Sequence, residues 1–152
     1  MKPINLILLI VFFITSCKSN IMENTLIIKE SPYDIETTYG KLKTIVENNP
    51  NLKILLELDH SKNAANAGLE LNPTKIMLFG NPKLGTPLMQ ASQTVSIDLP
   101  QKVIVYTTAD AGTKIAYNDP FYLKERHAIE GKDELLTKIS NALNTITNKV
   151  IE

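Results

Sequence analysis

The chain has 152 residues, and its 16 basic and 16 acidic side chains give a formal net charge of zero at pH 7. This balance lacks the basic footprint of a nucleic-acid-binding protein, so we expect no nucleic-acid partner. The chain has one cysteine, which excludes a disulfide framework, and its stability must therefore come from a hydrophobic core.

The N-terminus has the order of a secretory signal: Lys2, the apolar run LILLIVFFI and a small-residue end. The run is shorter than the roughly 20 residues that span a bilayer. It closes on Ile14-Thr15-Ser16-Cys17, which resembles the lipobox of bacterial lipoproteins, where the cysteine is acylated after cleavage. The resemblance implies a signal peptide over residues 1–16 and a membrane partner through lipid on Cys17. It places the protein in the cell envelope, on the periplasmic side of a bacterial membrane. An uncleaved signal with an incidental buried thiol is the alternative.

Cleavage after Ser16 would leave 136 residues, with one more acidic than basic side chain. That length suits one domain and is too short for two ordinary ones. We therefore expect a polar tether over residues 17–24 and a single domain over residues 25–152, which includes a C-terminal amphipathic helix.

The first half of the domain predicts strands over residues 25–30, 52–59 and 74–79. Between the first two, the apolar spacing predicts a helix from Ile35 to Val46, capped by Asp34 or Ser31 and ended by Asn48-Asn49-Pro50. In the second strand, strict alternation predicts one buried face, formed by Leu52, Ile54, Leu56 and Leu58. A short helix over residues 60–67, closed by Gly68, follows that strand.

The second half predicts a helix from Pro87 to about Val95, because Thr86-Pro87 resembles an N-cap followed by the first helical residue. Strands over residues 102–107 and 114–118 read as a hairpin joined by a glycine-containing loop. Asp119-Pro120 opens a short helix that ends at Arg126 or His127. The last helix has one apolar face, made of Leu135, Leu136, Ile139, Leu143, Ile146 and Val150.

This order suits an α+β fold with helices packed on a mostly antiparallel sheet. Gly40 interrupts the first helix, and we expect it to mark a close contact between that helix and the sheet.

Several sequence blocks resemble the domain-of-unknown-function 302 family of bacteria and archaea. They are Asp59-His60, Gly68-Leu69, Leu71-Asn72-Pro73-Thr74, LFGNPKLGTPLMQ over residues 78–90, and YNDPFYLKERH over residues 117–127. The resemblance implies a small α+β domain with a curved, mostly antiparallel sheet in an arrangement like that of the TATA-binding protein. It also implies a tendency to form homodimers. It implies no reaction and no cofactor.

The segment FGNPKLGTPLM predicts a corner between a strand and a helix, with Asn81 held extended by the following proline. A structurally demanding turn is one interpretation of this corner. The other is a ligand contact, in which a helix N-terminus after Thr86 could meet an anion. The segment is not a phosphate loop, because it lacks the Gly-Lys-Ser/Thr ending.

The two histidines, His60 and His127, are candidates for acid–base chemistry, since histidine titrates near neutral pH. With Met89 they could attract a soft metal ion, but their spacing fixes no geometry and we predict no metal site. Structural hydrogen bonding is the third interpretation. A polar cleft that joins His60, Asn81, Asn118 and His127 would be the candidate ligand site.

Other catalytic patterns, including the nucleophile elbow and the dinucleotide fingerprint, are absent from the sequence. We therefore expect a lipid-anchored envelope protein that binds an unidentified ligand or interacts with a partner. An enzyme that uses His60 or His127 as acid or base is one alternative. A structural homodimer is the other.

Overall fold

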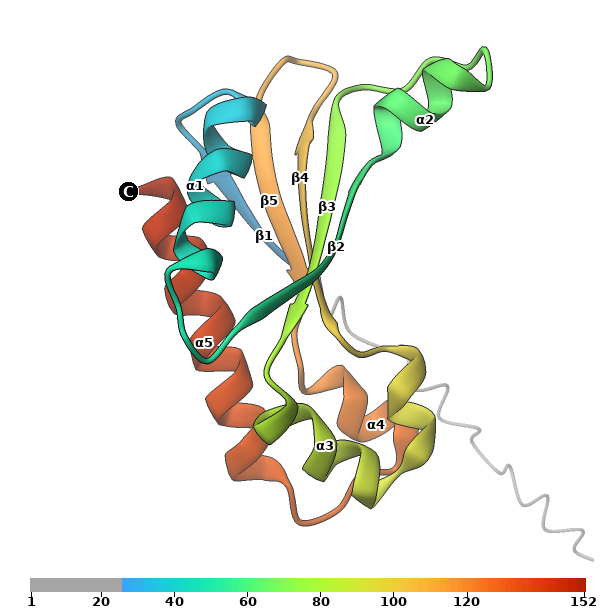
Figure 1. The fold of residues 1–152 in the computed structure, drawn as a ribbon, viewed down its shortest axis with the longest axis vertical. Helices are drawn as coiled ribbons and strands as arrows, with labels where there is room; N and C mark the ends of the chain where they lie inside the picture. The colour runs from blue at the N-terminus through green and yellow to red at the C-terminus, as the bar shows by residue number, and fades with distance from the viewer. Residues whose placement is uncertain (1–25) are drawn as a thin grey trace, which may run out of the picture.

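The structure is a computed structural model that describes residues 26–152. The expected signal peptide, the lipidation site Cys17 and the tether over residues 17–24 lie outside the described residues. The described part forms a five-stranded antiparallel sheet with the strand order β1-β5-β4-β3-β2. Two long helices, α1 and α5, cover one face of this sheet (Figure 1). The α+β fold predicted from the sequence is therefore confirmed.

The element bounds follow the predicted ones within a residue or two, except for α3 and α4. The strands are β1 (Leu26–Ser31), β2 (Lys53–Asp59), β3 (Thr74–Gly80), β4 (Gln101–Thr107) and β5 (Thr113–Asn118). The helices are α1 (Ile35–Glu47), α2 (His60–Asn66), α3 (Pro82–Ala91), the 3-10 turn η1 (Gln93–Ile97), α4 (Tyr122–His127) and α5 (Asp133–Ile151).

The core lies between the sheet and the two long helices. The last helix has the apolar face that its sequence predicted, with Leu136, Ile139 and Leu143 among its buried residues. Side chains that alternate along the central strands meet this face and that of α1. The fully buried members of this layer include Leu42, Val46, Met77, Val103, Val105, Ile115, Leu136 and Val150.

Helix α1 begins where the sequence predicted. The Oδ1 atom of Asp34 accepts the backbone N–H of Thr37 at 2.8 Å, so Asp34 and not Ser31 is the N-cap. The expectation for Gly40 is wrong, because a Cβ atom built there would have no atom within 4 Å. Gly40 is exposed and makes no close approach to the sheet.

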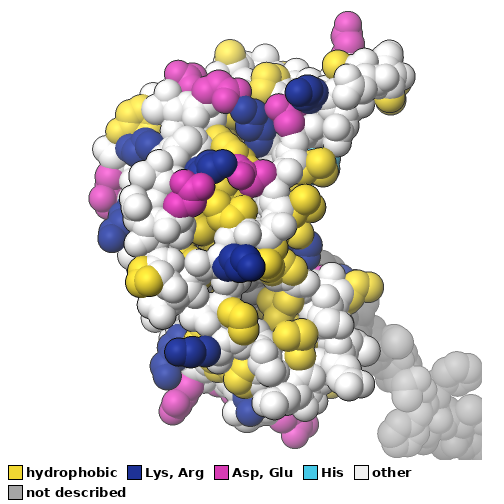
Figure 2. Space-filling model, in the orientation of Figure 1, with side chains coloured by type: hydrophobic (Ala, Val, Ile, Leu, Met, Phe, Trp, Pro, Cys, Tyr) yellow, Lys and Arg dark blue, Asp and Glu magenta, His cyan; other side chains and the backbone are white. Residues whose placement is uncertain are grey.

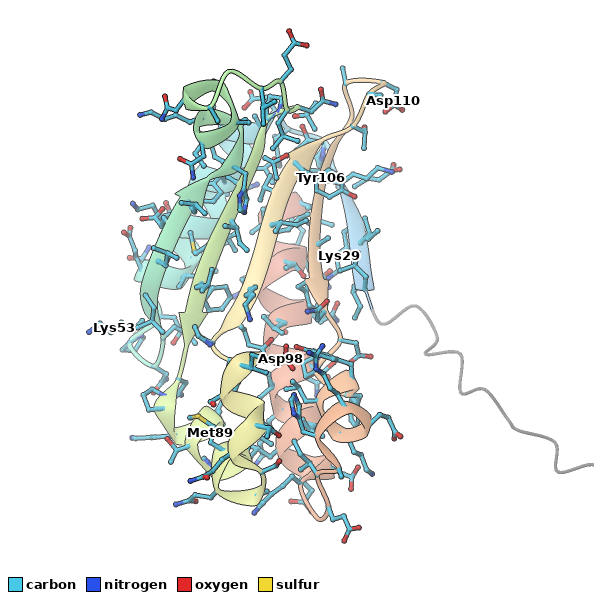
Figure 3. All side chains as sticks on the ribbon, turned by 90° about the vertical axis from the view of Figure 1, so that its right-hand side faces the viewer. Lys29, Lys53, Met89, Asp98, Tyr106 and Asp110 are labelled. Atoms are coloured by element: carbon cyan, nitrogen blue, oxygen red, sulfur yellow. The ribbon has the colours of Figure 1, made fainter. Side chains whose placement is uncertain are left out.

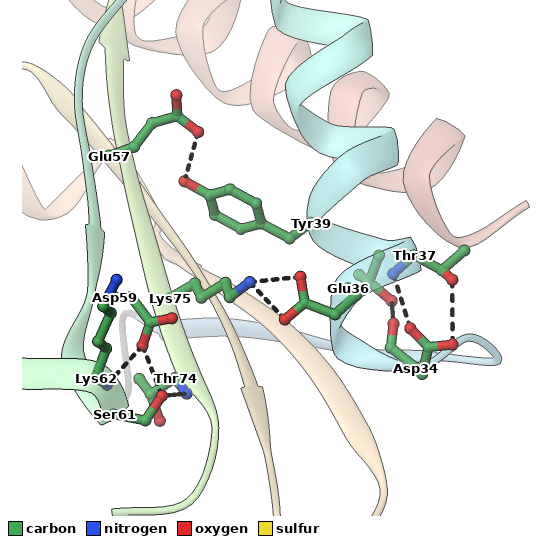
Figure 4. Close-up of polar contacts among 11 residues, drawn as sticks. Asp34, Glu36, Thr37, Tyr39, Glu57, Asp59, Ser61, Lys62, Thr74 and Lys75 are labelled. Atoms are coloured by element: carbon green, nitrogen blue, oxygen red, sulfur yellow. Dashed lines mark hydrogen bonds and ion pairs between the residues drawn. The ribbon is translucent and has the colours of Figure 1, made fainter. Parts of the chain in front are cut away.

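Polar side chains tie α1 to the edge of the sheet near β2 and β3 (Figure 4). Glu57 accepts hydrogen bonds from the Tyr39 hydroxyl at 3.1 Å and from Lys43 Nζ at 2.8 Å. Lys75 pairs with Glu36 at 2.5 Å. Burial, together with the hydrogen bond to Glu57, raises the pKa of Tyr39, so its phenol stays a donor at every physiological pH.

A single lysine ties the opposite edge strand, β1, to α5. Lys29 Nζ donates to the Oδ1 atoms of Asn144 and Asn148 and to Thr147 Oγ1, at 2.7, 2.5 and 2.7 Å. All of these acceptors are uncharged, and burial lowers the pKa of Lys29.

The predicted buried face of β2 is wrong, because the strand contains a β-bulge. Ile54 pairs with Phe79, and the next pair is Leu56 with Leu78, which leaves Leu55 as the extra residue. The bulge moves Leu56 and Leu58 to the sheet face opposite the helices. Leu56 is 49% exposed and does not belong to the core.

The predicted bounds of α3 are also wrong. The helix begins at Pro82 with Asn81 as its N-cap, and Pro87 lies inside it. The sequence offers two successive cap-plus-proline signals, Asn81-Pro82 and Thr86-Pro87, and the chain uses the first. In the same way α4 begins at Tyr122, because Asp119 and Pro120 form the turn that precedes it.

The second face of the sheet carries no helix. Figure 3 looks onto this face. The long helices lie behind the strands, and Tyr106 points from β4 away from them. Helix α2 projects from one end of the sheet, whereas α3, η1 and α4 form a lobe at the other end (Figure 1). The outline between them is hollowed and bears hydrophobic side chains (Figure 2). We call this surface the open sheet face. In the order of the strands β2, β3, β4, β5 and β1, its central row is Leu58, Ile76, Ile104, Ala116 and Ile28.

Candidate functional site

An apolar cavity of about 330 Å³ lies between α3, α5 and the end of the sheet where β2 begins and β3 ends. Its volume is at the lower end of the range of small-molecule sites, roughly 300 to 1,000 Å³. We call it the apolar cavity. Its hydrophobic lining consists of Leu52, Leu55, Phe79, Pro82, Leu84, Met89, Leu99, Pro100, Ile139, Ala142, Leu143 and Ile146.

A bulge that the sequence did not predict and a corner that it did predict both contribute to this cavity. The bulge in β2 leaves Leu55 unpaired, and this residue lines the cavity. Helix α3 begins directly after β3, with Asn81 as its N-cap, so the helix crosses the end of the sheet. Gly85 also lines the cavity, and a Cβ atom there would meet Leu99 at 3.6 Å and Met89 at 4.0 Å. The glycine therefore leaves free space between α3 and the start of β4.

A second, more polar cavity of about 790 Å³ adjoins the first. The two share five lining residues: Leu52, Asn81, Leu84, Ala142 and Ile146. We call the second one the polar groove. Its other lining residues come from α1, from the turn before β2 and from α5, and most carry amides or hydroxyls: Thr44, Ile45, Asn48, Asn49, Pro50, Asn51, Asn141, Thr145 and Lys149.

The charged residues in the two linings are both lysines. Lys53 lines the apolar cavity and Lys149 lines the polar groove, and no aspartate or glutamate lines either. Both lysines are exposed, and within residues 26–152 neither ammonium group has an ion-pair or hydrogen-bond partner. Figure 3 shows Lys53 at the start of β2 and Met89 below it, in the lobe that contains α3. The linings of the two cavities therefore carry a formal positive charge and no negative one.

The backbone at the start of α3 is not free to bind an anion, contrary to one interpretation of the corner. Asn81 Oδ1 accepts the Lys83 N–H at 2.9 Å, and the Asn81 carbonyl accepts those of Leu84 and Gly85, both at 2.9 Å. Pro82 has no N–H to offer. Because the helix begins here and not after Thr86, its first-turn donors are all satisfied by Asn81.

His127 belongs to a hydrogen-bonded network in the lobe that holds η1 and α4. Its Nε2 atom lies 2.6 Å from Asp98 Oδ2, and its Nδ1 atom lies 2.9 Å from Thr94 Oγ1. Arg126 Nε is 3.2 Å from the same Asp98 oxygen. Burial alone would raise the pKa of Asp98, but the hydrogen bond from His127 and the positive charge of Arg126 hold it below its usual value.

Tyr122 and Asn118 lie beside this network. The Tyr122 hydroxyl is close to the side chains of Asp98 and Asn118, and burial, with the nearby charge of Asp98, raises the pKa of Tyr122 to about 12. When Asp98 accepts from Nε2–H, neutral His127 can accept the Thr94 hydroxyl proton at Nδ1. This is the order of groups that activates a hydroxyl nucleophile. However, the His127 side chain is only 5% exposed, and no residue of this network lines the apolar cavity or the polar groove.

The structure brings together some of the predicted site residues but not all four. Asn118 lies near Tyr122, which is close to the hydrogen-bonded pair of Asp98 and His127. Asn81 lies at the same end of the sheet and lines both cavities. His60 follows the last residue of β2, where Asp59 pairs with Lys75, and is separated from Asn81 by the length of β3. A cleft that joins all four residues does not form.

The sequence did not predict the two lysines or the amide-rich turn over residues 48–51 as parts of a site. Isolated surface lysines and a helix-ending Asn-Asn-Pro-Asn carry no functional pattern on their own, and the fold alone brings them beside α5. Among residues 26–152, no three histidine, cysteine, aspartate or glutamate side chains are grouped so that they could hold a metal ion. Over the same residues, no helix is both long and apolar enough to cross a membrane.

Comparison with known proteins identifies the domain. Residues 27–146 match the family described as Domain of unknown function DUF302. The chain belongs to the DUF302 family. A crystal structure of an uncharacterised conserved DUF302 protein from Bacillus stearothermophilus superposes with a TM-score of 0.75 at 18% identity. The match covers 84% of this chain and 98% of that one, so the fold makes up nearly all of the Bacillus chain in that structure.

The DUF302 chain also resembles part of longer proteins. It is 30% identical over 111 residues to proteins named Fluoride-specific ion channel FluC 1 from Brucella suis and Brucella abortus. These matches cover 73% of this chain but only 43% and 41% of the two Brucella proteins. The chain therefore spans about two fifths of the length of these relatives.

Proposed function

We propose that this chain is a lipid-anchored envelope protein whose DUF302 domain binds a small apolar ligand in the apolar cavity. The observation that carries the proposal is the cavity itself, which has the volume of a ligand site and an almost wholly hydrophobic lining. The segment FGNPKLGTPLM supplies much of one wall, from Phe79 to Met89. Burial of an apolar ligand there would gain about 25 cal/mol for each Å² removed from water.

Binding of 1-decanol tests this function. The protein would be the chain that starts at Lys18, which lacks the acylated cysteine and needs no detergent. We expect its addition to shift the methyl NMR signals of Met89 and Ile146. Ala142 is exposed and lines both cavities, so Ala142→Trp should fill the entrance and abolish the shifts. Ala109→Trp, in the exposed loop at the other end of the sheet, is the matched control. Binding that is absent, or that survives Ala142→Trp, would contradict the proposal.

The anchoring part of the proposal rests on the sequence of residues 1–17. Cys17→Ser should abolish labelling by a radioactive fatty acid and leave either an uncleaved or a soluble exported product. Unchanged labelling of the variant would end the lipoprotein hypothesis and leave the cavity proposal untouched.

The open sheet face supports a second candidate function, that of a homodimer module. Its central row crosses all five strands, and Ile28 and Leu56 on this face are 45% and 49% exposed. Five strands about 4.8 Å apart and about 20 Å long give a flat area on the order of 500 Å², more than half of the roughly 800 Å² that each partner buries in a standard interface. Glu30 and Lys114 on this face lie 3.8 Å apart, so these two charges neutralise each other within one copy.

We therefore propose a second copy of this chain as the occupant of the open sheet face. Sedimentation should show a dimer at micromolar concentration, and Ile104→Glu should convert it to a monomer because it buries a charge in the centre of the interface. A chain that is monomeric at 100 µM would refute this candidate.

A further inference from the structure

We propose that the ligand is a single-chain amphiphile with an anionic head group, a carboxylate or a phosphate. This inference rests on the proposed function, and it adds the chemistry of both ends of the ligand. It follows from the way in which the apolar cavity and the polar groove share one wall.

The apolar cavity would take the hydrocarbon chain. It lies against the core on the sides of Phe79 and Leu143, and Met89 gives it an unbranched, adaptable side chain that can follow a flexible ligand. Because the lining offers few hydrogen-bonding groups, a polar atom deep in this cavity would lose its hydration without compensation. An alkyl chain has no such cost. Each methylene added to the ligand should tighten binding about fourfold until the cavity is full.

The polar groove would take the head group. Asn49 Oδ1 already accepts the Asn51 N–H at 3.0 Å, so the amide NH₂ of Asn49 remains as a donor. Asn48, Asn141 and Thr145 line the same groove and add further polar groups. Donors of this kind bind a carboxylate or phosphate oxygen well.

The charges select an anion over a cation. Lys53 stands at the apolar cavity and Lys149 in the polar groove, and neither lining contains a carboxylate that could neutralise them. An exposed ion pair contributes up to about fivefold in affinity, so two lysines together should favour an anionic head group by about tenfold. A cationic head group would meet the same two charges as repulsion.

The position of the cavity suits a ligand that partitions into membranes. Leu26, the first residue of β1, pairs with Asn118 at the end of the sheet that also holds Lys53 and Gly80. With Cys17 acylated, residues 18–25 could extend over roughly 30 Å at most. The cavity would then lie near the bilayer surface, where single-chain amphiphiles are concentrated.

Calorimetric titration with matched ligands tests this inference. The chain that starts at Lys18 would be titrated with decanoate, 1-decanol and decyltrimethylammonium, each below its critical micelle concentration. We expect decanoate to bind about tenfold more tightly than 1-decanol, and the cation to bind more weakly than either. In Lys53→Met/Lys149→Met the preference for decanoate over decanol should vanish, while decanol affinity stays within twofold. Lys62→Met changes an exposed lysine on α2, at the other end of the sheet, and should leave all three affinities unchanged.

The outcomes test the proposed function and the anionic head group separately. If no ligand of the three binds, the proposed function itself fails. If decanol and decanoate bind equally, the cavity binds apolar ligands but the anionic head group is refuted. A preference for decanoate that survives the double lysine substitution also refutes it. Decyl phosphate in place of decanoate then distinguishes a phosphate from a carboxylate head group.

Discussion

The bulge in β2 makes a quantitative prediction about Leu56. Strict alternation would place this side chain in the core, where Leu→Ala costs about 2 to 5 kcal/mol. The structure leaves it 49% exposed on the open sheet face. Full burial of a leucine gives about 1.5 to 3 kcal/mol, so half burial corresponds to about 1 kcal/mol, and a site that borders solvent leaves no closed cavity. We therefore expect Leu56→Ala to lower the free energy of unfolding by about 1 kcal/mol.

Urea unfolding of the chain that starts at Lys18, at low micromolar concentration or below, measures this cost. Leu42→Ala is the matched control, because Leu42 in α1 is fully buried and should lose about 2 to 5 kcal/mol. If a second copy covers the open sheet face, the cost of Leu56→Ala should grow with protein concentration, whereas that of Leu42→Ala should not. A cost above about 2 kcal/mol for Leu56→Ala in dilute, monomeric protein would refute the bulge and the register built on it.

Two other changes probe the local geometry and the polar network. Gly40→Ala should raise the free energy of unfolding by up to about 1 kcal/mol, since Gly40 lies inside α1 with no neighbour for a Cβ atom, and thermal melting measures it; a loss of stability would mean that this helix face is crowded. Gly68→Ala should lower the free energy of unfolding, because Gly68 has a φ of 73°, a left-handed conformation that is unfavourable for alanine. Asp98→Asn should destabilise the protein more at pH 6 than at pH 3: a carboxyl whose pKa is lowered by folding adds stability above its unfolded pKa of about 4 and loses it as the pH falls below that value. A cost that is the same at both values would show that Asp98 is not held ionised by His127 and Arg126.

The sequence predicted most helices and strands because their signals are local. Asp34 caps α1 by accepting the N–H of Thr37, only three residues further along the chain. The apolar spacing of α5 directly indicates its buried face. The errors have non-local causes. Two equivalent cap-plus-proline signals compete at Asn81 and Thr86, and the end of β3 at Gly80 decides between them. The bulge at Leu55 depends on the pairing of β2 with β3, which no pattern within β2 reveals.

The candidate site was only partly visible in the sequence for the same reason. The corner at Asn81 was recognised as a place where a ligand contact was conceivable, and it does line the apolar cavity. The side chains that complete the site, such as Ala142 and Lys149, lie on a helix more than 60 residues further along the chain. His60 and His127 attracted attention by their chemistry, yet the fold places them at different ends of the sheet and outside the linings of both cavities.

The central claim, that the apolar cavity binds a hydrocarbon chain, is tested most directly by intermolecular NOEs between decanoate and the methyl groups of the protein. The account predicts NOEs from the end of the decanoate chain to the methyl groups of Met89 and Ile146, both of which line the cavity. NOEs to Leu58 and Ile76 instead would place the ligand on the open sheet face and contradict the account, as would the absence of any NOE at saturating decanoate.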